Sequence, residues 1–228
     1  SIGVLEIERA EVLTPAEQRL VAGVTRIYRN FLSLLDYSER DTLTGLLNRK
    51  TFDESFMKRA AGRPQARSGQ AESEARRGDG GYWLGVADID HFKRVNDNFG
   101  HLIGDEVLLL LARLLRSSFR VHDRLYRFGG EEFVVLVRCG SEADAAAAFE
   151  RLRTNVEGFS FPQVGRISVS VGFTRVKPAD SPSGAFERAD RAVYHAKHLG
   201  RNQVCSHADL IERGLLEDVD KVGDVELF

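Results

Sequence analysis

Hydrophobic residues recur at a helical spacing near the start of the chain. The spacings of 4, 3, 4 and 3 residues are the heptad pattern of a two-helix coiled coil. Thr14-Pro15-Ala16-Glu17 precedes them, with threonine suited to the N-cap, proline to the first helical position and glutamate to a capping box. Because two heptads make a short seam, an amphipathic helix packed against its own domain is the alternative. The hydrophobic positions are Leu20, Val24, Ile27, Phe31 and Leu34.

Downstream of this helix, apolar runs of strand length alternate with longer amphipathic segments. Two of the runs are continuously apolar, as expected of buried strands, and one alternates polar and apolar residues. The order of helix, strand, helix, hairpin, helix, strand and helix indicates an α/β fold, an α+β sandwich with helices around a mostly antiparallel central sheet. The predicted strands are 84–87, 124–128, 134–137 and 166–173, and the predicted helices are 104–116, 143–156 and 184–199.

Three segments lack the pattern of a packed element. Residues 62–81 contain no large apolar side chain to offset the entropy of ordering, which predicts a mobile loop. Residues 209–226 carry seven acidic residues against two basic ones, which indicates a short helix followed by a solvated tail. Residues 2–7 predict a short strand. We therefore expect an N-terminal segment over 1–40, one main domain over 41–205 and an acidic tail over 206–228.

Two glycines and two glutamates lie at the predicted hairpin tip, between residues 124–128 and 134–137. Gly129 and Gly130 carry no Cβ, so the backbone can turn tightly and approach a bulky ligand. Glu131 and Glu132 repel each other and favour a cation beside them, which suggests a site for Mg²⁺ and phosphate. The alternative is an ordinary acidic turn.

A second pair of carboxylates follows the predicted strand 84–87. Asp88 falls where that strand ends, which is where open sheets place ligand chemistry. If this strand pairs beside the hairpin, Asp88 and Glu131 converge on one cation, as metal-assisted phosphoryl or nucleotidyl transfer requires. The alternative is that Asp88 and Asp90 only cap the next helix and form a solvated turn before it. That alternative stays open for one of the two residues.

Together these residues resemble the GGDEF domain, the catalytic domain of diguanylate cyclases, in its Gly-Gly-Glu-Glu-Phe form. The resemblance runs from Asp41 to about Val204 and implies the palm-like fold of class III nucleotidyl cyclases and many polymerases. The connection over 62–81 is longer than the family's usual one. In this family a helix like the N-terminal one commonly links an upstream sensor domain, so we expect a fragment of a longer protein. The matching segments are 41–49, 88–93, 96–97, 101–105, 129–133, 170–173, 189–197 and 200–202.

The resemblance implies a metal site for Mg²⁺ or Mn²⁺. Its ligands would be the carboxylates of Asp88 and Glu131 and the backbone carbonyl of Ile89, because hard oxygen ligands suit these ions. Glu131 would also help to deprotonate the ribose 3′-hydroxyl, and Glu132 would support the metal site.

The resemblance also implies how a guanine nucleotide is held. Asn96 and Asp105 would read the guanine edge, because a carboxylate accepts from guanine N–H groups that adenine lacks. Lys197 and Arg201 are four residues apart, which would place both on one helical face as a clamp for the triphosphate; taken alone, they are a pair of surface charges. The remaining substrate contacts would come from Phe92, Lys93, His101, Gly129 and Gly130.

The implied reaction condenses two GTP molecules into cyclic di-GMP and two pyrophosphates. Each domain binds one GTP, so two domains must face each other, and the N-terminal heptad seam would support this homodimer. Arg120-Val121-His122-Asp123 matches the family's site for inhibition by cyclic di-GMP, with Arg151 as a secondary contact. The main alternative is a degenerate domain that serves as a nucleotide receptor or scaffold, although Asp88 and both glutamates are present. A mixed guanine-adenine product is a further alternative, which Asp105 disfavours.

Composition agrees with this interpretation. A net charge of −2 with 29% charged residues argues against a basic surface for nucleic acid. The apolar runs are far shorter than the roughly 20 residues that span a bilayer, and no signal peptide is evident. Cys139 and Cys205 make neither a disulfide framework nor a zinc site. We therefore expect a cytoplasmic protein with no membrane contact by this segment.

Overall fold

The computed structural model describes residues 13–60 and 80–217 of the chain. It divides the chain into two units, 1–39 and 40–228. The strand expected over 2–7 and the tail from residue 218 onward lie outside the described residues. Most of the loop expected over 62–81 also lies outside the described residues. Of its last two residues, which are described, Gly81 begins a strand.

The first unit contains helix α1, Pro15–Glu39. Its start is the predicted capping box, because Glu17 Oε2 accepts hydrogen bonds from the backbone N–H (2.8 Å) and the hydroxyl (2.7 Å) of Thr14. The heptad positions expose their side chains, as illustrated by Leu20 at 67% and Ile27 at 71%. Within its own unit, the apolar seam of α1 is therefore exposed.

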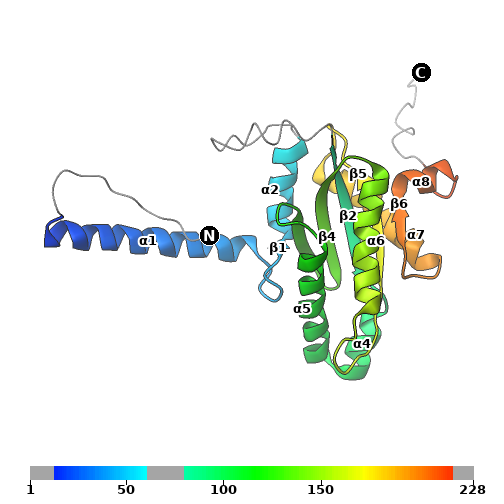
Figure 1. Ribbon diagram of the computed structural model, residues 1–228, viewed down its shortest axis with the longest axis horizontal. Coiled ribbons are helices and arrows are strands. Elements are labelled where there is room, and N and C mark those ends of the chain that lie inside the picture. The colour runs from blue at the N-terminus through cyan, green and yellow to red at the C-terminus, as the bar shows by residue number, and fades with distance from the viewer. Residues whose placement is uncertain (1–12, 61–79, 218–228) are drawn as a thin grey trace, which may run out of the picture. The chain divides into compact units, whose positions relative to one another are not determined.

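The second unit is built around a six-stranded sheet in the order β1-β3-β4-β2-β5-β6 (Figure 1). The four central strands pair antiparallel, and the short edge strands β1 and β6 pair parallel to β3 and β5. This confirms the predicted mostly antiparallel sheet flanked by helices. Among the described residues, no helix is long and apolar enough to cross a membrane. The strands are β1 Leu47–Asn48, β2 Gly81–Ile89, β3 Arg124–Gly129, β4 Glu132–Cys139, β5 Val169–Arg175 and β6 Val204–Ser206. The helices are α2 Arg49–Ala60, α4 Phe92–Phe99, α5 His101–Ser118, α6 Glu142–Gly158, α7 Pro182–His198 and α8 His207–Glu212.

The sheet is buried on both faces, which explains its continuously apolar strands. Because successive side chains of a strand point to opposite faces, β4 divides between two core clusters. Phe133 and Val135 pack with residues of α4, α5 and α6, whereas Val134 and Leu136 pack with residues of α2 and α7. The two helical layers hold the carboxyl end of β2 and the β3–β4 turn in place.

One predicted helix ends earlier than the sequence suggested. Helix α7 stops at His198, and the chain then enters the left-handed region at Gly200 (φ 111°), Arg201 (φ 66°) and Asn202 (φ 46°). The expectation that Lys197 and Arg201 share one helical face is therefore wrong. The physical reason is a glycine cap, because Gly200 has a positive φ and the backbone N–H of Arg201 donates to the carbonyl of Ala196 (3.0 Å). The backbone N–H of Asn202 then donates to buried Asp90 Oδ2 (3.0 Å).

The strand predicted over 166–173 also begins later, at Val169. The preceding residues form a tight turn, in which the backbone N–H groups of Phe161 and Gly165 each donate to the other's carbonyl (2.7 and 2.9 Å). Ser168 then uses its carbonyl to accept from the backbone N–H of Asp90 (2.9 Å).

Candidate functional site

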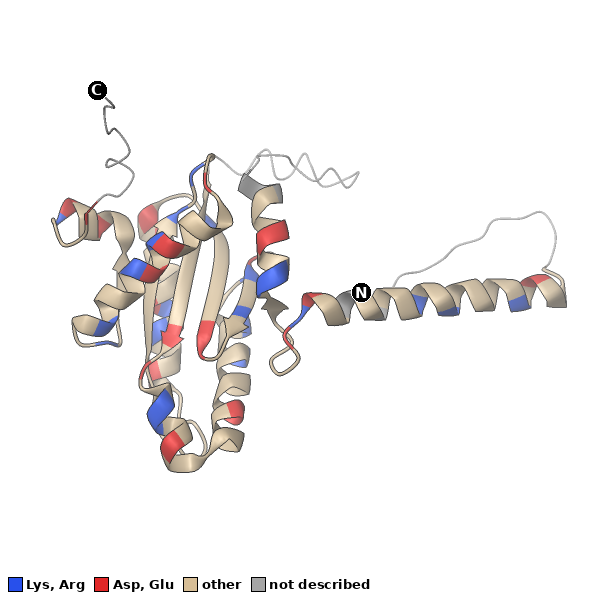
Figure 2. Cartoon of the chain, turned by 180° about the vertical axis from the view of Figure 1, so that it is seen from behind, with Lys and Arg blue, Asp and Glu red and all other residues tan. Residues whose placement is uncertain are grey.

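Two acidic segments meet at one end of the sheet. The antiparallel register of β2 and β4 pairs Asp88 with Glu132, and Glu131 precedes them at the hairpin tip. Figure 2 shows acidic residues side by side at these strand ends. The turn that presents the glutamates needs its glycines, because Gly129 (φ 141°) and Gly130 (φ 51°) both have positive φ angles.

Helix α7 adds a cation and a further carboxylate to this site. Lys197 Nζ lies 2.7 Å from Asp88 Oδ1. Asp190 lies seven residues earlier on α7, two helical turns away on the same face. The helix approaches the sheet closely, since a Cβ on Gly172 of β5 would lie 2.2 Å from the carbonyl oxygen of Ala189.

The carboxylates of the site raise one another's pKa values. Burial raises the pKa of Asp88, and the ion pair with Lys197 only partly offsets this effect. Burial also raises the pKa of Glu131, with further contributions from Asp88 and Glu132. For Glu132 the causes are burial and then the charges of Asp190 and Asp88. Four acids and one lysine leave this site with an excess of negative charge.

The donor set fits a divalent cation. Carboxylate oxygens are hard ligands, and a cation beside them would relieve the repulsion that raises their pKa values. No three His, Cys, Asp or Glu side chains within 13–60 and 80–217 are grouped closely enough to hold a metal by themselves. Asp88 and Glu131 would therefore need a further oxygen, such as the backbone carbonyl of Ile89.

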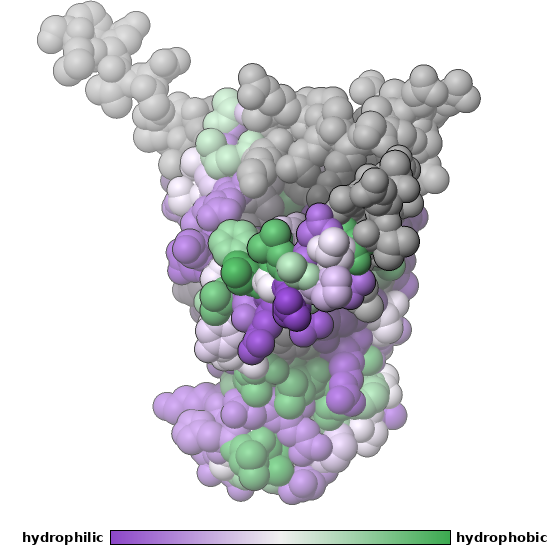
Figure 3. Space-filling model, turned by 90° about the vertical axis from the view of Figure 1, so that its left-hand side faces the viewer, coloured by the Kyte–Doolittle hydropathy of each residue, from purple (hydrophilic) through white to green (hydrophobic). Residues whose placement is uncertain are grey.

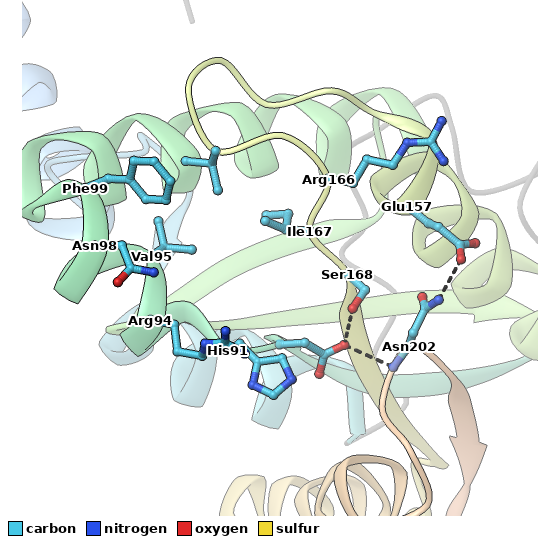
Figure 4. A pocket seen from close by; sticks show the side chains of 12 residues that line it. His91, Arg94, Val95, Asn98, Phe99, Glu157, Arg166, Ile167, Ser168 and Asn202 are labelled. Atoms are coloured by element: carbon cyan, nitrogen blue, oxygen red, sulfur yellow. Dashed lines mark hydrogen bonds between the residues drawn. The ribbon is translucent and has the colours of Figure 1, made fainter.

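Asp90 serves a different purpose from Asp88. It is 4% exposed and accepts hydrogen bonds from the hydroxyls of Ser168 (2.6 Å) and Ser170 (2.7 Å) and from the backbone of Asn202. Figure 4 shows Ser168 and Asn202 converging on this carboxylate. Its acceptors are used within the fold, so Asp90 braces the turn after β2.

A cavity of about 480 Å³ adjoins this network. Side chains of α4, of the segment before β5 and of Asn202 line it (Figure 4). Asp88, Glu131 and the residues expected to read guanine are not in its lining. The chemistry of the site therefore does not coincide with this cavity.

A chain of contacts braces the hairpin tip. Arg127 Nη2 donates to the carbonyl oxygen of Gly130 (2.8 Å), and Arg127 Nη1 donates to both carboxylate oxygens of Asp41 (3.1 and 3.2 Å). Asp41 also accepts from the backbone N–H (2.8 Å) and hydroxyl (2.6 Å) of Thr44. Burial alone would raise the pKa of Asp41, but the hydrogen bonds from Thr44 and the charge of Arg127 lower it. The Asp41 segment therefore holds the tip in place.

The residues expected to read guanine come from successive helices. Asn96 is half-buried on α4, and Asp105 is exposed on α5. Phe92 is 5% exposed and belongs to the core beneath them. The α4–α5 junction exposes Phe99 (42%) and Leu102 (81%), and hydrophobic surface is visible at that end of the domain in Figure 3. Three further residues expected to contact the nucleotide are also exposed: Lys93, His101 and Arg201.

The predicted inhibitory motif forms the turn between α5 and β3. The carboxylate of Asp123 accepts from the backbone N–H of Arg120 (2.9 Å), and the Arg120 side chain is exposed. On α6, Arg151 donates two hydrogen bonds to the carbonyl of Ser118 (3.0 and 2.7 Å), at the end of α5. Arg151 is thus tied to the segment that carries Arg120.

The sequence analysis missed two residues of this arrangement. Asp190 lies within a recognised motif, and its spacing of seven residues from Lys197 on a helix was the available signal. Arg127 carried no such signal, because its partner Asp41 lies 86 residues away in the sequence.

Comparison with known proteins identifies the family to which this chain belongs. Residues 38–203 match the family model described as "Diguanylate cyclase, GGDEF domain". The chain is 41% identical over 168 residues to the diguanylate cyclase DgcP of Pseudomonas aeruginosa, with 72% of this chain and 23% of that protein covered. It is 37% identical over 169 residues to DgcZ of Escherichia coli, with 73% and 52% covered. The chain thus spans about a quarter to a half of the length of these two relatives.

A solved structure is similar over a larger part of the chain. It contains the coiled coil and GGDEF domain of DgcB from Caulobacter crescentus in complex with cyclic di-GMP. The similarity has a TM-score of 0.68 at 31% identity and covers 85% of this chain and 100% of that one.

Proposed function

Because the chain belongs to the GGDEF-domain family, we propose that it acts as a diguanylate cyclase, condensing two GTP molecules into cyclic di-GMP and two pyrophosphates. The observation that supports this best is the meeting of Asp88, Glu131 and Glu132 with Lys197 at one end of the sheet. A degenerate domain would have no need to keep this concentration of repelling carboxylates.

A divalent cation, Mg²⁺ or Mn²⁺, would be held by Asp88, Glu131 and the Ile89 carbonyl. When bound, it supplies positive charge that stabilises the charge developing on the α-phosphate. The raised pKa of Glu131 suits it to accept the proton of the ribose 3′-hydroxyl. Glu132 and Asp190 add negative charge around the metal, and Lys197 would pass from Asp88 to the triphosphate, with Lys93 and Arg201.

Guanine recognition would rest on Asn96 and Asp105. Asp105 is exposed and acidic, so it can accept from guanine N1–H and N2–H₂, for which adenine has no equivalent. His101 and the glycines Gly129 and Gly130 would shape the remaining surface of the nucleotide site, and buried Phe92 would support it from the core.

The reaction needs two domains with opposed hairpins, because each GTP attacks the other. The exposed apolar seam of α1 is suited to pair two chains. Its resemblance to the coiled-coil segment named for DgcB favours the same use here. A substrate such as GTP places the reaction in the cytoplasm, and the signal would come from an upstream domain.

Product inhibition is part of this proposal. The exposed Arg120 guanidinium can bond phosphate oxygens and a guanine edge, and Asp123 can accept from the base. Arg151 already lies against the end of α5 next to this turn.

The test is to incubate the purified protein with GTP and Mg²⁺, beside Glu131→Ala, and to separate the nucleotides by chromatography. Cyclic di-GMP from the parent and none from the variant is the expected result. No product, even at high protein concentration and after removal of bound inhibitor, would favour a receptor for GTP or cyclic di-GMP.

A further inference from the structure

The first turns of α5 contain a glycine whose backbone does not need one. Gly104 is buried within α5 and is not among the glycines with positive φ. Glycine in a helix interior is less favourable than alanine, because it loses more conformational freedom on folding. The reason for glycine at this position must therefore lie in what surrounds it.

The side chain of Asn96 occupies the space that a side chain at position 104 would take. A Cβ built on Gly104 would lie 2.0 Å from Asn96 Oδ1 and 3.1 Å from Asn96 Cγ. The next nearest atom is Phe92 Cζ at 3.4 Å, an ordinary contact distance. The conflict thus concerns the amide of Asn96 almost alone.

We propose that Gly104 is a positioning residue for guanine recognition, which seats the Asn96 amide against α5 at the residue that precedes Asp105. This inference rests on the proposed function, because it assigns Gly104 the task of orienting one of the two side chains that would read the base. Because position 104 has no side chain, the side chain of Asn96 on α4 can lie directly against the backbone of α5.

The geometry also indicates how a change would act. The atom in conflict is the end of a flexible side chain, so an alanine would be accommodated by rotation of Asn96 rather than by movement of the helices. Folding would be preserved, since alanine is the better helix former, while the amide would leave its place against position 104.

The experiment compares Gly104→Ala with Gly158→Ala, a matched control on α6 where a Cβ would meet no atom within 4 Å. The probe is 3′-deoxy-GTP, which binds without a 3′-hydroxyl to react, titrated by calorimetry with Mg²⁺. We expect Gly104→Ala to raise the Kd about tenfold, the scale of one lost hydrogen bond, with an unchanged or higher Tm. The control should bind like the parent.

A double-mutant cycle separates this role from a general effect on the site. In an Asn96→Ala background, Gly104→Ala should weaken 3′-deoxy-GTP binding no further, because no amide remains to be displaced. Equal weakening in both backgrounds, or parental affinity for Gly104→Ala, would overturn the inference.

Failure of the proposed function has a different signature. A parent protein that does not bind 3′-deoxy-GTP would overturn the guanine-nucleotide site itself. In that case a crystal structure of Gly104→Ala still tests the positioning role, because an Asn96 side chain that stays in its parental rotamer would contradict it.

Discussion

Glu131 combines a catalytic assignment with an unfavourable position in the fold. Burial and the neighbouring charges of Asp88 and Glu132 raise the pKa of its carboxyl. An acid whose pKa is raised on folding stabilises the protein at low pH, below its unfolded value, and this contribution is lost as pH rises through the folded pKa. At neutral pH and without metal, Glu131 therefore destabilises the folded domain.

Glu131→Gln should consequently separate activity from stability. We expect cyclic di-GMP synthesis to fall about 10²-fold or more, the scale for loss of a general base, while the Tm in EDTA at pH 7 stays equal or rises. Mg²⁺ should raise the Tm of the parent more than that of the variant. Exposed Glu212→Gln is the control, and a variant that loses both activity and Tm would contradict the assignment.

For Asp41, folding changes the pKa in the opposite direction, so its contribution to stability depends on pH in the opposite way. Burial would raise its pKa, but hydrogen bonds from Thr44 and the Arg127 guanidinium outweigh this and lower it from 3.8. Stability from Asp41 is therefore present above the unfolded value and is lost as pH falls through the folded pKa, below about 3.8.

Asp41→Asn should cost about 1.5 kcal/mol in free energy of unfolding at neutral pH, the low end of the range for hydrogen bonds to a charged group, because the side chain is partly exposed to solvent. The difference from the parent, measured by urea unfolding, should shrink as pH falls below the unfolded pKa. Asp209→Asn removes an exposed pair with Arg213 and should change little. A pH-independent difference for Asp41→Asn would contradict this account.

Among the elements, α1 exposes a seam that no residue of its own helix can cover. Burial of each large apolar side chain in a partner helix contributes about 1.5–3 kcal/mol, so a short seam can hold two chains together. The helix itself begins with its capping box.

Replacing Leu20, Val24 and Ile27 with glutamine should keep the helix and weaken the dimer by at least about 100-fold, since the apolar burial is lost. Sedimentation and turnover measured over a protein dilution series check this, with activity lost first at low concentration. Arg19→Gln with Arg26→Gln, both exposed and off the seam, is the control. Unchanged turnover at low concentration would count against a role for α1.

For the whole molecule, the turn proposed as the inhibitory site and the hairpin tip lie at opposite ends of β3. That strand has six residues, so the two features are separated by roughly 20 Å at 3.3 Å per residue. A ligand at Arg120 would therefore act by holding domains in an unproductive arrangement and not by blocking the metal site.

Arg120→Ala should then raise the concentration of cyclic di-GMP that half-inhibits synthesis by about tenfold or more, from the loss of charge-assisted hydrogen bonds, with the initial rate unchanged. Inhibition curves at fixed GTP measure this. Arg124→Ala, four residues along and also exposed, is the matched control. A variant that cyclic di-GMP inhibits as strongly as the parent would contradict the proposed inhibitory role of this turn.

The sequence by itself was enough for the family, the antiparallel sheet and the acidic residues at its end. Glycines at the tip, apolar strand runs and the capping box are local signals, each set by the conformational preference of a few neighbouring residues. The residues expected to bind the metal and guanine were named from the resemblance to the family.

Only the tertiary structure decided which side chains work together. Arg127 braces the tip through Asp41, 86 residues away, and Asn202 bonds Asp90 across 112 residues. The same holds for Asn96 against the bare surface of Gly104. Local preferences are determined by neighbours in sequence, whereas these contacts exist only after packing brings distant segments to hydrogen-bond distance, so no pattern along the chain records them.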